Sequence, residues 1–444
     1  MNYLSEKNIF AGEKIGVNWS QFWQKEDWWT VWIAVTLILF SLFKLVSRIP
    51  VPGNWNTNPL QAFAGAQFFH FLLLGGGLAL ITGLAITVMR EKVHSYLVSF
   101  PIVFGLSLLA FTLSRQVTLN RYQFDSVIWA LLLGLLISNT VGLPRWLAPA
   151  ARTELFIKTG LVLMGAEILF SRILLLGTYG LGVAWLVTPI VLIFMFIMGT
   201  KLFKIESKAL VATISAATSV CGVSAAIAAG AATRARREEI SYAISLSLLF
   251  TVLMMIVFPN LIKLAGLSEA VGGALIGGTI DSTGAVVVAG AMVGKKAMEV
   301  AAIIKMIQNT LIGVVAFFLS LYWVTRVEQG APGSRPSLLQ IWERFPKFII
   351  GFVLASVFFS FILTPALGAP EVDNILKLTR GLRNWLFCLA FVSIGLESSV
   401  SRLMALGKGG WPVYLYITGQ LFNIALTYLA AVFFFGGKFF PAVM

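Results

Sequence analysis

The sequence contains very few of the residues that build metal centres and disulfide frameworks. It has two cysteines and two histidines in 444 residues. Cys221 and Cys388 both fall inside apolar segments, with no second cysteine or histidine at ligand spacing. Such spacing supports neither a disulfide framework nor a metal site. We therefore expect a protein that has no metal and no other cofactor, apart from coupling ions.

Charged residues are also scarce, at 12% of the chain, whereas 58% of the residues are hydrophobic. A soluble domain cannot hide so much apolar surface from water, so we predict an all-α, multi-pass protein of the cell (inner) membrane. The net charge of +14 comes from short Lys/Arg runs between apolar segments. Runs of this kind lie beside anionic lipid headgroups, so we expect lipid contacts and no nucleic acid.

Enzyme signatures are missing as well. The sequence has no phosphate-binding Walker loop, no paired His/Glu metalloprotease motif and no nucleophile elbow. We therefore predict that the protein is not an enzyme and has no ATPase of its own.

Long apolar stretches dominate the remainder. Counting those of sufficient length between charged breaks gives about thirteen candidate membrane segments. They run approximately over 28–46, 64–89, 95–117, 127–147, 154–171, 178–203, 207–232, 240–263, 268–294, 298–324, 346–367, 378–400 and 410–437.

The order of these segments predicts a division of the chain into four parts. They are an N-terminal extension with two membrane helices (1–94), a first part of the core that contains both Gly-rich segments (95–324), a Pro/Gly/Ser-bearing loop (325–345) and the last three helices of the core (346–444).

A weak internal repeat links two distant stretches, "MGAEILFSRILLLG" (164–177) and "IGLESSVSRLMALG" (394–407). An odd number of segments separates them, so their helices should run in opposite directions, which is typical of the inverted repeats of secondary transporters. Chance identity between two apolar stretches is the alternative. The shared residues are Gly165/Gly395, Glu167/Glu397, Ser171/Ser401, Arg172/Arg402, Leu176/Leu406 and Gly177/Gly407.

Two apolar segments, 207–232 and 268–294, are unusually rich in Gly, Ala, Ser and Thr. Glycine in a membrane helix weakens it and exposes backbone, which is tolerated only where the backbone is buried in protein or lines a cavity. We therefore predict two broken or re-entrant helices. Their half-helix N-termini could face an anion, and their freed carbonyls a cation. Close helix packing through small residues is the alternative.

Asp281 lies in the second of these segments, beside Ser282 and Thr283. An ionisable residue at membrane depth is expensive, so we predict an ion-coupling role for it, with Na⁺ binding at Asp281 and Thr283 as one form of that role. A shallow hairpin with Asp281 near water is the alternative. Lys305 would either contact an anionic substrate, pair with Asp281, or extend toward the near interface.

The residues that we expect to contact the substrate surround these two segments and the helix that follows them. They are Thr218, Ser219, Cys221, Gly222 and Ser224 in the first segment, Thr279, Ser282, Thr283 and Gly284 in the second, and Lys305, Gln308 and Asn309.

The string from Ser219 to Ser224 and the string "IDSTGAVVVAG" (280–290) resemble the two motifs of the YeiH-type family, which is described as a group of sulfate exporters. The resemblance covers roughly residues 95–437 and implies a fold similar to sodium/proton antiporters and bile-acid/sodium symporters, often dimeric. The His, Glu and Gln of the family's second motif are Asp281, Ser282 and Ala285 here, and its usual Arg is Gln308. A different chemistry of ion coupling follows from these departures.

Together these observations predict a secondary active transporter that exports sulfate or a small organic anion, coupled to Na⁺ or H⁺, and the resemblance adds a homodimer. One alternative is a Na⁺/H⁺ antiporter without an anion substrate. Another is a membrane scaffold or sensor that transports nothing and binds a partner through residues 28–89.

Overall fold

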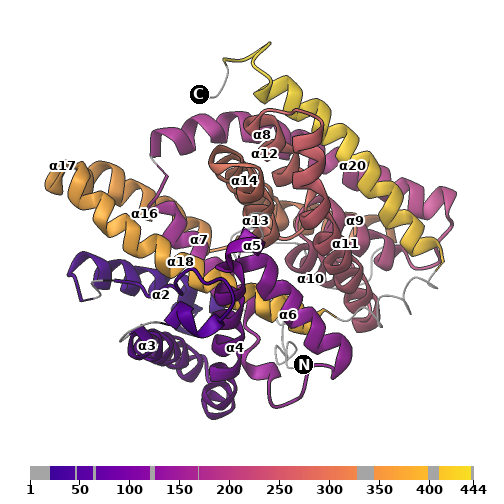
Figure 1. The fold of residues 1–444 in the computed structure, drawn as a ribbon. Coiled ribbons are helices and arrows are strands. Elements are labelled where there is room, and N and C mark those ends of the chain that lie inside the picture. The colour runs from indigo at the N-terminus through magenta and orange to yellow at the C-terminus, as the bar shows by residue number, and fades with distance from the viewer. Residues whose placement is uncertain are drawn as a thin grey trace.

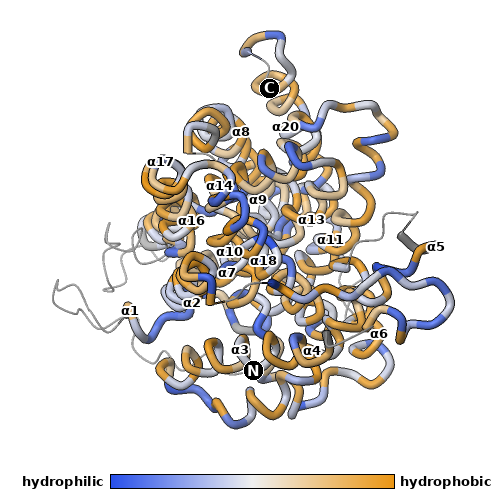
Figure 2. Tube along the Cα trace, turned by 60° about the vertical axis from the view of Figure 1, so that its left-hand side comes forward, coloured by the Kyte–Doolittle hydropathy of each residue, from blue (hydrophilic) through white to orange (hydrophobic). Residues whose placement is uncertain are grey.

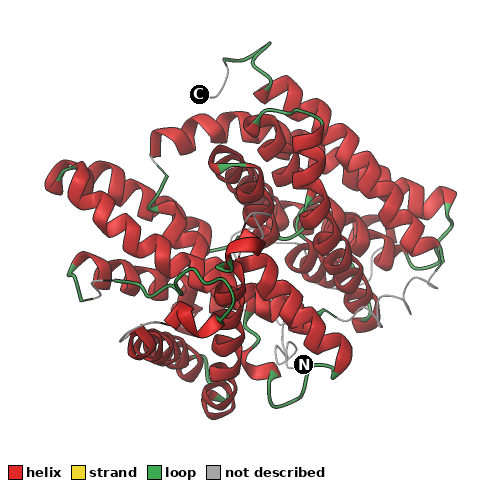
Figure 3. Ribbon diagram, viewed as in Figure 1, coloured by secondary structure: helices red, strands yellow, loops and turns green. Residues whose placement is uncertain are grey.

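The computed structural model describes residues 21–45, 48–63, 67–120, 126–168, 170–327, 345–398 and 410–441. Within these ranges every named element is a helix (Figure 3), so the predicted all-α class is confirmed. The predicted loop 325–345 and the second copy of the repeat beyond residue 398 lie almost wholly outside the described residues.

The helices follow the predicted segments closely. The first part of the chain contains α1 (Gln21–Gln24), α2 (Glu26–Leu42), α3 (Gln67–Val88), α4 (Val93–Ser114), α5 (Val117–Asn120), α6 (Ser126–Thr140), α7 (Thr153–Gly165) and α8 (Phe170–Ile197). The middle part contains α9 (Lys208–Ser219), α10 (Gly222–Ala232), α11 (Arg237–Leu264), α12 (Glu269–Thr279), α13 (Thr283–Val293) and α14 (Lys295–Tyr322). The last part contains α16 (Phe348–Val357), α17 (Thr364–Leu367), α18 (Ala369–Glu397) and α20 (Trp411–Phe435). Short 3₁₀ or π turns are η1 (Pro59–Phe63), η2 (Ala148–Ala150), η3 (Met198–Leu202), η4 (Trp323–Val327) and η5 (Phe358–Leu363).

Seven helices of the described residues are long and apolar enough to cross a membrane. They occupy Phe68–Val88, Val93–Ser114, Ile173–Leu202, Glu238–Leu264, Lys295–Val327, Phe348–Leu367 and Trp411–Phe435. Figure 2 shows that apolar residues dominate the helices, while polar residues gather in the connections. Each predicted segment coincides with a helix or a pair of helices, but the predicted number of membrane segments is not confirmed.

The helices pack in two groups (Figure 1). We call α2, α3, α4, α6, α7, α16 and α18 the first bundle, and α8 to α14 with α20 the hairpin bundle. Contacts are dense inside each group and sparse between them, where α7 meets α13 and α16 meets α8. At one such contact, a Cβ on Gly284 would collide with the side chain of Ile157, so the two bundles approach closely there.

The first Gly-rich segment is a hairpin that enters the bundle and returns. The helix breaks at Val220 and Cys221, whose backbone is not helical, and α10 then packs alongside α9. The outer ends of both helices, marked by Ser207 and Thr233, line the same pocket. A straight broken helix would place these ends on opposite sides of the protein, so this segment is re-entrant.

The second Gly-rich segment, α12 and α13, has the same shape. The Glu269 carboxylate at the start of α12 accepts hydrogen bonds from the backbone N–H of Lys296 (2.9 Å) and Ala297 (3.3 Å), directly after the end of α13. The outer turns of both helices therefore meet the first turn of α14. Glycine is needed there: a Cβ on Gly273 would lie 2.5 Å from the Ala297 carbonyl oxygen, and one on Gly290 2.7 Å from the Met298 Cα.

The two hairpins approach each other from opposite ends of α14. The second hairpin packs on the first turns of α14, as described above. The first hairpin packs on its last turns, where Val220 and Ala216 share an apolar cluster with Ile312 and Trp323. Because α14 is about 40 Å long, the tips of the hairpins meet near its midpoint.

Contacts between α7 and α18 recur at the spacing of the sequence repeat. Thr153 Oγ1 donates to Glu397 Oε2 (3.1 Å), and Arg383 Nη1 lies 2.7 Å from Glu167 Oε1. Residues 153 and 383, like 167 and 397, are separated by 230 positions, which is the offset of the predicted repeat. The pairing also shows that α7 and α18 are antiparallel.

The N-terminal helix α2 is an integral part of the first bundle. Asp27 Oδ1 lies 2.6 Å from the Lys158 Nζ of α7, and Asp27 Oδ2 accepts the backbone N–H of Lys347 (3.3 Å), just before α16. One carboxylate therefore joins three helices.

The contact between α6 and α18 provides a test of this packing. A Cβ at Gly134 would lie 2.5 Å from the Val392 carbonyl oxygen and 2.8 Å from the Gly395 Cα. We expect Gly134→Val to lower the free energy of unfolding by about 1–3 kcal/mol through overpacking, seen as a lower Tm in detergent. Gly105→Val is the matched control, because nothing lies within 4 Å of a Cβ there. Equal Tm values for the two variants would contradict this packing.

Candidate functional site

The two hairpin tips touch each other through their backbones. The N–H of Gly222, the first residue of α10, donates to the carbonyl oxygen of Asp281 (3.0 Å). A Cβ on Gly222 would collide with the Ser247 hydroxyl and lie 3.4 Å from the Asp281 Cβ. Only glycine lets the two tips approach this closely.

Asp281 is buried at this junction, with 2% of its surface exposed. Its Oδ2 accepts hydrogen bonds from the Ser247 hydroxyl of α11 (2.7 Å) and from the Tyr416 hydroxyl of α20. The hairpin is therefore not shallow, and the alternative that Asp281 lies near water is wrong.

Lys305 of α14 is also buried, with 1% of its surface exposed. Its Nζ donates to the Val220 carbonyl oxygen (2.6 Å) and to Gln308 Oε1 (2.7 Å). Within the described part of the chain, its contacts do not include the carboxylate of Asp281. Lys305 thus neither pairs directly with Asp281 nor extends to the membrane interface.

The carbonyl groups at the inner ends of α9 and α12 are satisfied by polar side chains. These ends leave carbonyls without helical partners, which is costly in an apolar environment. Side chains of α8, α14 and α20 supply the donors. Gln308 Nε2 (2.8 Å) and Thr188 Oγ1 (3.1 Å) donate to the Ser219 oxygen, Gln420 Nε2 donates to the Thr279 oxygen (2.7 Å), and Asn423 Nδ2 lies 3.4 Å from the oxygens of Thr218 and Gly278.

The inner N-termini of α10 and α13 lack the side-chain partners that the inner carbonyl ends have. Their N-cap residues, Cys221 and Ser282, make no side-chain cap, whereas Ser207 at the outer start of α9 accepts the N–H of Leu210 (3.1 Å). In the described structure, no acceptor contacts the N–H groups of Val223 and Ser224 or those of residues 283–285. Two helix N-termini therefore present unpaired donors at the tips.

Several polar oxygens at the tips also have no hydrogen-bond partner among the residues that the structure describes. They are Ser219 Oγ, Asn309 Oδ1 and Gln420 Oε1, all in buried residues. Asn309 Nδ2 donates to the Thr283 hydroxyl (3.0 Å). The two amide oxygens can only accept a hydrogen bond, whereas the Ser219 hydroxyl can also donate one.

The structure places the predicted site residues at one junction, although not all of them face outward from it. Ser224, Ser282 and Thr283 are half-buried at the open N-termini, and Gly284 lies against α7. The hydroxyls of Thr218 and Thr279 instead donate to carbonyls of their own helices, those of Ile214 (2.9 Å) and Leu275 (2.6 Å). Gln308 and Lys305 support the tip backbone rather than project from it.

The sequence analysis missed the polar residues that come from helices distant in sequence. They are Thr188, Ser247, Tyr416, Gln420 and Asn423. A signal did exist in α20, where Gln420, Asn423 and Thr427 recur on one face of an otherwise apolar helix. Polar residues on one face of a membrane helix point to a packed polar contact.

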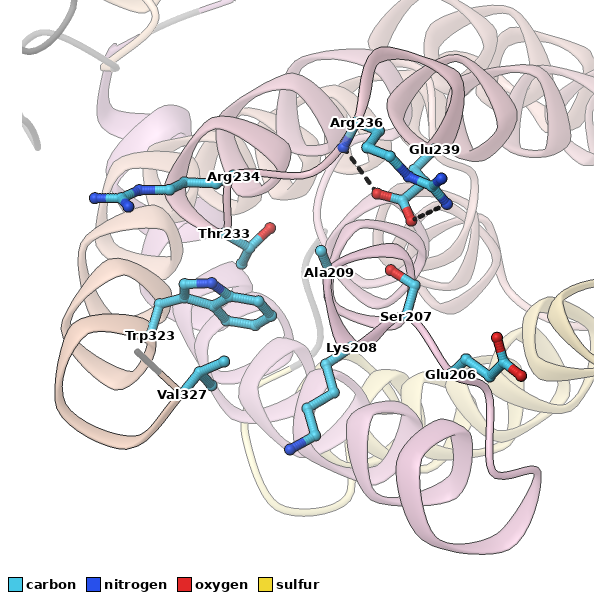
Figure 4. Close-up of a pocket in the computed structure, with 10 residues that line it drawn as sticks. All are labelled: Glu206, Ser207, Lys208, Ala209, Thr233, Arg234, Arg236, Glu239, Trp323 and Val327. Carbon is cyan, nitrogen blue, oxygen red and sulfur yellow. Dashed lines mark hydrogen bonds and ion pairs between the residues drawn. The ribbon is translucent and has the colours of Figure 1, made fainter. Parts of the chain in front are cut away.

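The structure also contains an open pocket of about 600 Å³, but it lies elsewhere. Figure 4 shows it at the outer end of the first hairpin, with Trp323 on one side and the ion pair of Arg236 and Glu239 on another. The length of α9 places it about 18 Å from the tips. This pocket is therefore distinct from the candidate site.

Gln308 provides a direct test of the carbonyl contacts. We expect Gln308→Leu to lower the free energy of unfolding by about 2 kcal/mol, because it leaves the Ser219 carbonyl and the Lys305 ammonium with one partner fewer. Thermal unfolding in detergent measures the effect. Thr310→Val is the control, since the Thr310 hydroxyl donates to Ile307 in its own helix (2.7 Å). An equal loss of unfolding free energy in Thr310→Val and Gln308→Leu would show that the contacts of Gln308 with the tip carbonyl and Lys305 do not stabilise the fold more than an ordinary helical hydroxyl does.

Comparison with known proteins identifies the relatives of this chain. Residues 99–410 match the family described as Conserved hypothetical protein 698. A UPF0324 membrane protein of Rhodopirellula baltica is 49% identical over 389 residues, covering 86% of this chain and 71% of that protein. A UPF0324 membrane protein of Nitratidesulfovibrio vulgaris is 48% identical over 381 residues, covering 84% of this chain and 65% of its own length.

A third relative, a UPF0324 membrane protein of Nitrosomonas europaea, is 28% identical over 446 residues and is covered over 90% of its length. The names of these relatives say that they are membrane proteins and give no substrate. The resemblance to the YeiH-type family is confirmed, and the membrane placement agrees with the seven apolar helices. The chain belongs to the UPF0324 membrane protein family.

Proposed function

We propose that this protein is a secondary active transporter of the cell membrane and that it binds a small anion at the hairpin tips. The observation that carries this proposal is the difference between the inner helix ends. Carbonyls at the ends of α9 and α12 have donors, whereas the N–H groups of Val223 and Ser224 and those of residues 283–285 have no acceptor among the described residues. A ligand that completes this site is an acceptor and carries negative charge.

The electrostatics of the tips favour the same class of ligand. Each helix N-terminus carries a partial positive charge of about half an elementary charge, and two of them converge here. Lys305 adds a buried ammonium group, which donates a hydrogen bond to the Val220 carbonyl. The hydroxyls of Ser224, Ser282 and Thr283 provide further donors at the half-buried surface. Sulfate, sulfonates and small carboxylates all fit these donors.

The arrangement of the helices supports a carrier rather than a static receptor. The hairpins enter from opposite ends of α14 and meet near its midpoint, so a ligand at the tips lies far from either end. The two bundles make few contacts with each other, and one of these contacts is Gly284 of the second hairpin against Ile157. Movement of one bundle against the other would expose the tips alternately to each side of the membrane.

An inverted repeat would account for this symmetry. The pairs of Thr153 with Glu397 and of Arg383 with Glu167 relate α7 to an antiparallel α18. A second pair of contacts agrees, because Ser356 of α16 donates to the Ile168 carbonyl and Ser138 of α6 donates to the Ser398 carbonyl. Antiparallel partners are what a two-fold axis across the helices would produce, as in transporters with inverted repeats.

Anion exchange in proteoliposomes tests this function without assuming a coupling ion. Vesicles containing the full chain are loaded with unlabelled sulfate, ethanesulfonate or glycolate, and the entry of the same labelled anion is followed with no ion gradient. We expect exchange of at least one of these anions above that of protein-free vesicles. No exchange of any of the three would rule out an anion carrier of this class.

A proline substitution tests the role of the backbone donors. Val223→Pro removes one unpaired N–H, and the fixed φ of proline suits the first turn of a helix. We expect the affinity for the anion to fall about tenfold, measured from the concentration that gives half-maximal exchange. Val223→Ala keeps the N–H and should retain the affinity of the natural protein. Equal affinities for the two variants would show that this amide does not contact the anion.

A further inference from the structure

We propose that the carrier takes up one proton, on the carboxylate of Asp281, together with one singly charged anion at the hairpin tips. This inference rests on the proposed function and names its coupling ion and the charge of its substrate. It is carried by the hydroxyl partners of Asp281, by the occupied tip carbonyls and by the charge balance of the buried groups.

A metal cation finds few suitable ligands at the tips. Hard cations are held by several oxygen atoms at once. The carbonyls of Ser219, Val220 and Thr279 already accept hydrogen bonds, and the ammonium group of Lys305 lies 2.6 Å from one of them. A metal cation beside Asp281 would therefore compete with the donors that already occupy these carbonyls and would be repelled by the ammonium group of Lys305.

The partners of Asp281 suit a carboxylate that gains and loses a proton. Ser247 and Tyr416 bind it through hydroxyl groups. A hydroxyl can donate to an ionised carboxylate and can rotate to accept from a protonated one, whereas an ammonium or backbone N–H can only donate. Both protonation states of Asp281 thus remain hydrogen-bonded in the same buried position.

The groups that face Asp281 from the surrounding elements include one basic side chain. Ser247 of α11 and Tyr416 of α20 are neutral, as is the thiol of Cys221 at the start of α10. The charged neighbour is Lys305 of α14. An anion at the start of α10 would lie close to the carboxylate, because the Gly222 N–H bonds to the Asp281 carbonyl.

This proximity links the two ligands. An anion beside an ionised Asp281 is repelled, and the repulsion disappears when the carboxylate accepts a proton and its O–H bond forms. Anion binding therefore raises the proton affinity of Asp281, and protonation raises the anion affinity by the same factor. The anion and the proton would bind cooperatively and move in the same direction.

The balance of charge favours this stoichiometry when Lys305 is an ammonium group, the form that its two hydrogen-bond acceptors stabilise. In the empty site the negative charge of Asp281 and the positive charge of Lys305 cancel. With a proton on Asp281 and a singly charged anion bound, the anion cancels Lys305, and the total is again zero. A buried site with net charge is costly to move through a membrane, so the empty and the fully loaded forms are the two that cross. A doubly charged anion such as sulfate leaves the loaded form with net negative charge.

Transport under a proton gradient tests the inference. Proteoliposomes containing the full chain and an internal pH-sensitive dye are kept free of Na⁺, with the membrane potential clamped at zero by K⁺ and an ionophore. An inward gradient of one pH unit should accumulate ethanesulfonate or glycolate about tenfold, as one proton per anion requires. The dye should report acidification when the anion enters, and changing the clamped potential should alter neither signal.

Two variants separate the role of Asp281 from general damage. Asp281→Asn mimics the protonated form, so it should still exchange the anion but should neither accumulate it under the pH gradient nor acidify the vesicles. Glu206→Gln, at the exposed outer end of the first hairpin, should couple like the natural protein. Accumulation by Asp281→Asn, a requirement for Na⁺, or flux that follows the membrane potential would overturn the inference while leaving anion transport intact. Failure of all three anions to exchange in the natural protein would overturn the proposed function, and this inference with it.

Discussion

The hydrogen bond between Gly222 and Asp281 is the contact on which the central architecture depends. It joins two hairpins that enter from opposite ends of α14, and it holds them tip to tip inside an apolar protein. A chain that stops halfway across a membrane and turns back must satisfy every backbone group at the turn. The glycine, the carbonyl of Asp281 and the amide side chains around them are the means by which this chain does so.

The amide side chains pair with the backbone carbonyls at the tips and not with the backbone N–H groups. Gln308, Gln420 and Asn423 donate to carbonyls at the inner ends of α9 and α12. Their side-chain oxygens do not accept from the tip backbone: Gln308 Oε1 accepts from the Lys305 ammonium and Asn423 Oδ1 from the Thr427 hydroxyl. The N–H groups of residues 223–224 and 283–285 have no acceptor among the described residues. The tips consequently have a polarity, with donors facing the half-buried side and acceptors turned toward α14 and α20.

Much of this site could be predicted from the sequence because glycine and hydroxyl residues in an apolar segment are locally anomalous. The breaks near Cys221 and Asp281 follow from that anomaly alone, and both were expected. Whether the chain continues or returns after a break is not local information. It depends on Gly273 and Gly290 meeting the first turn of α14, and on α9 and α10 lying side by side. For the same reason the partner of Lys305 was missed, since Val220 is 85 residues away.

The second hairpin is attached to α14 more closely at its outer end than the first hairpin is. Its glycines bring backbone against backbone, and the Glu269 carboxylate accepts the N–H groups of Lys296 and Ala297 at the start of that helix. The outer end of the first hairpin, by contrast, borders an open pocket beside Trp323. The second hairpin and α14 are therefore joined backbone to backbone, and we expect a motion that separates the two tips to occur in the first hairpin, whose outer end has open space beside it.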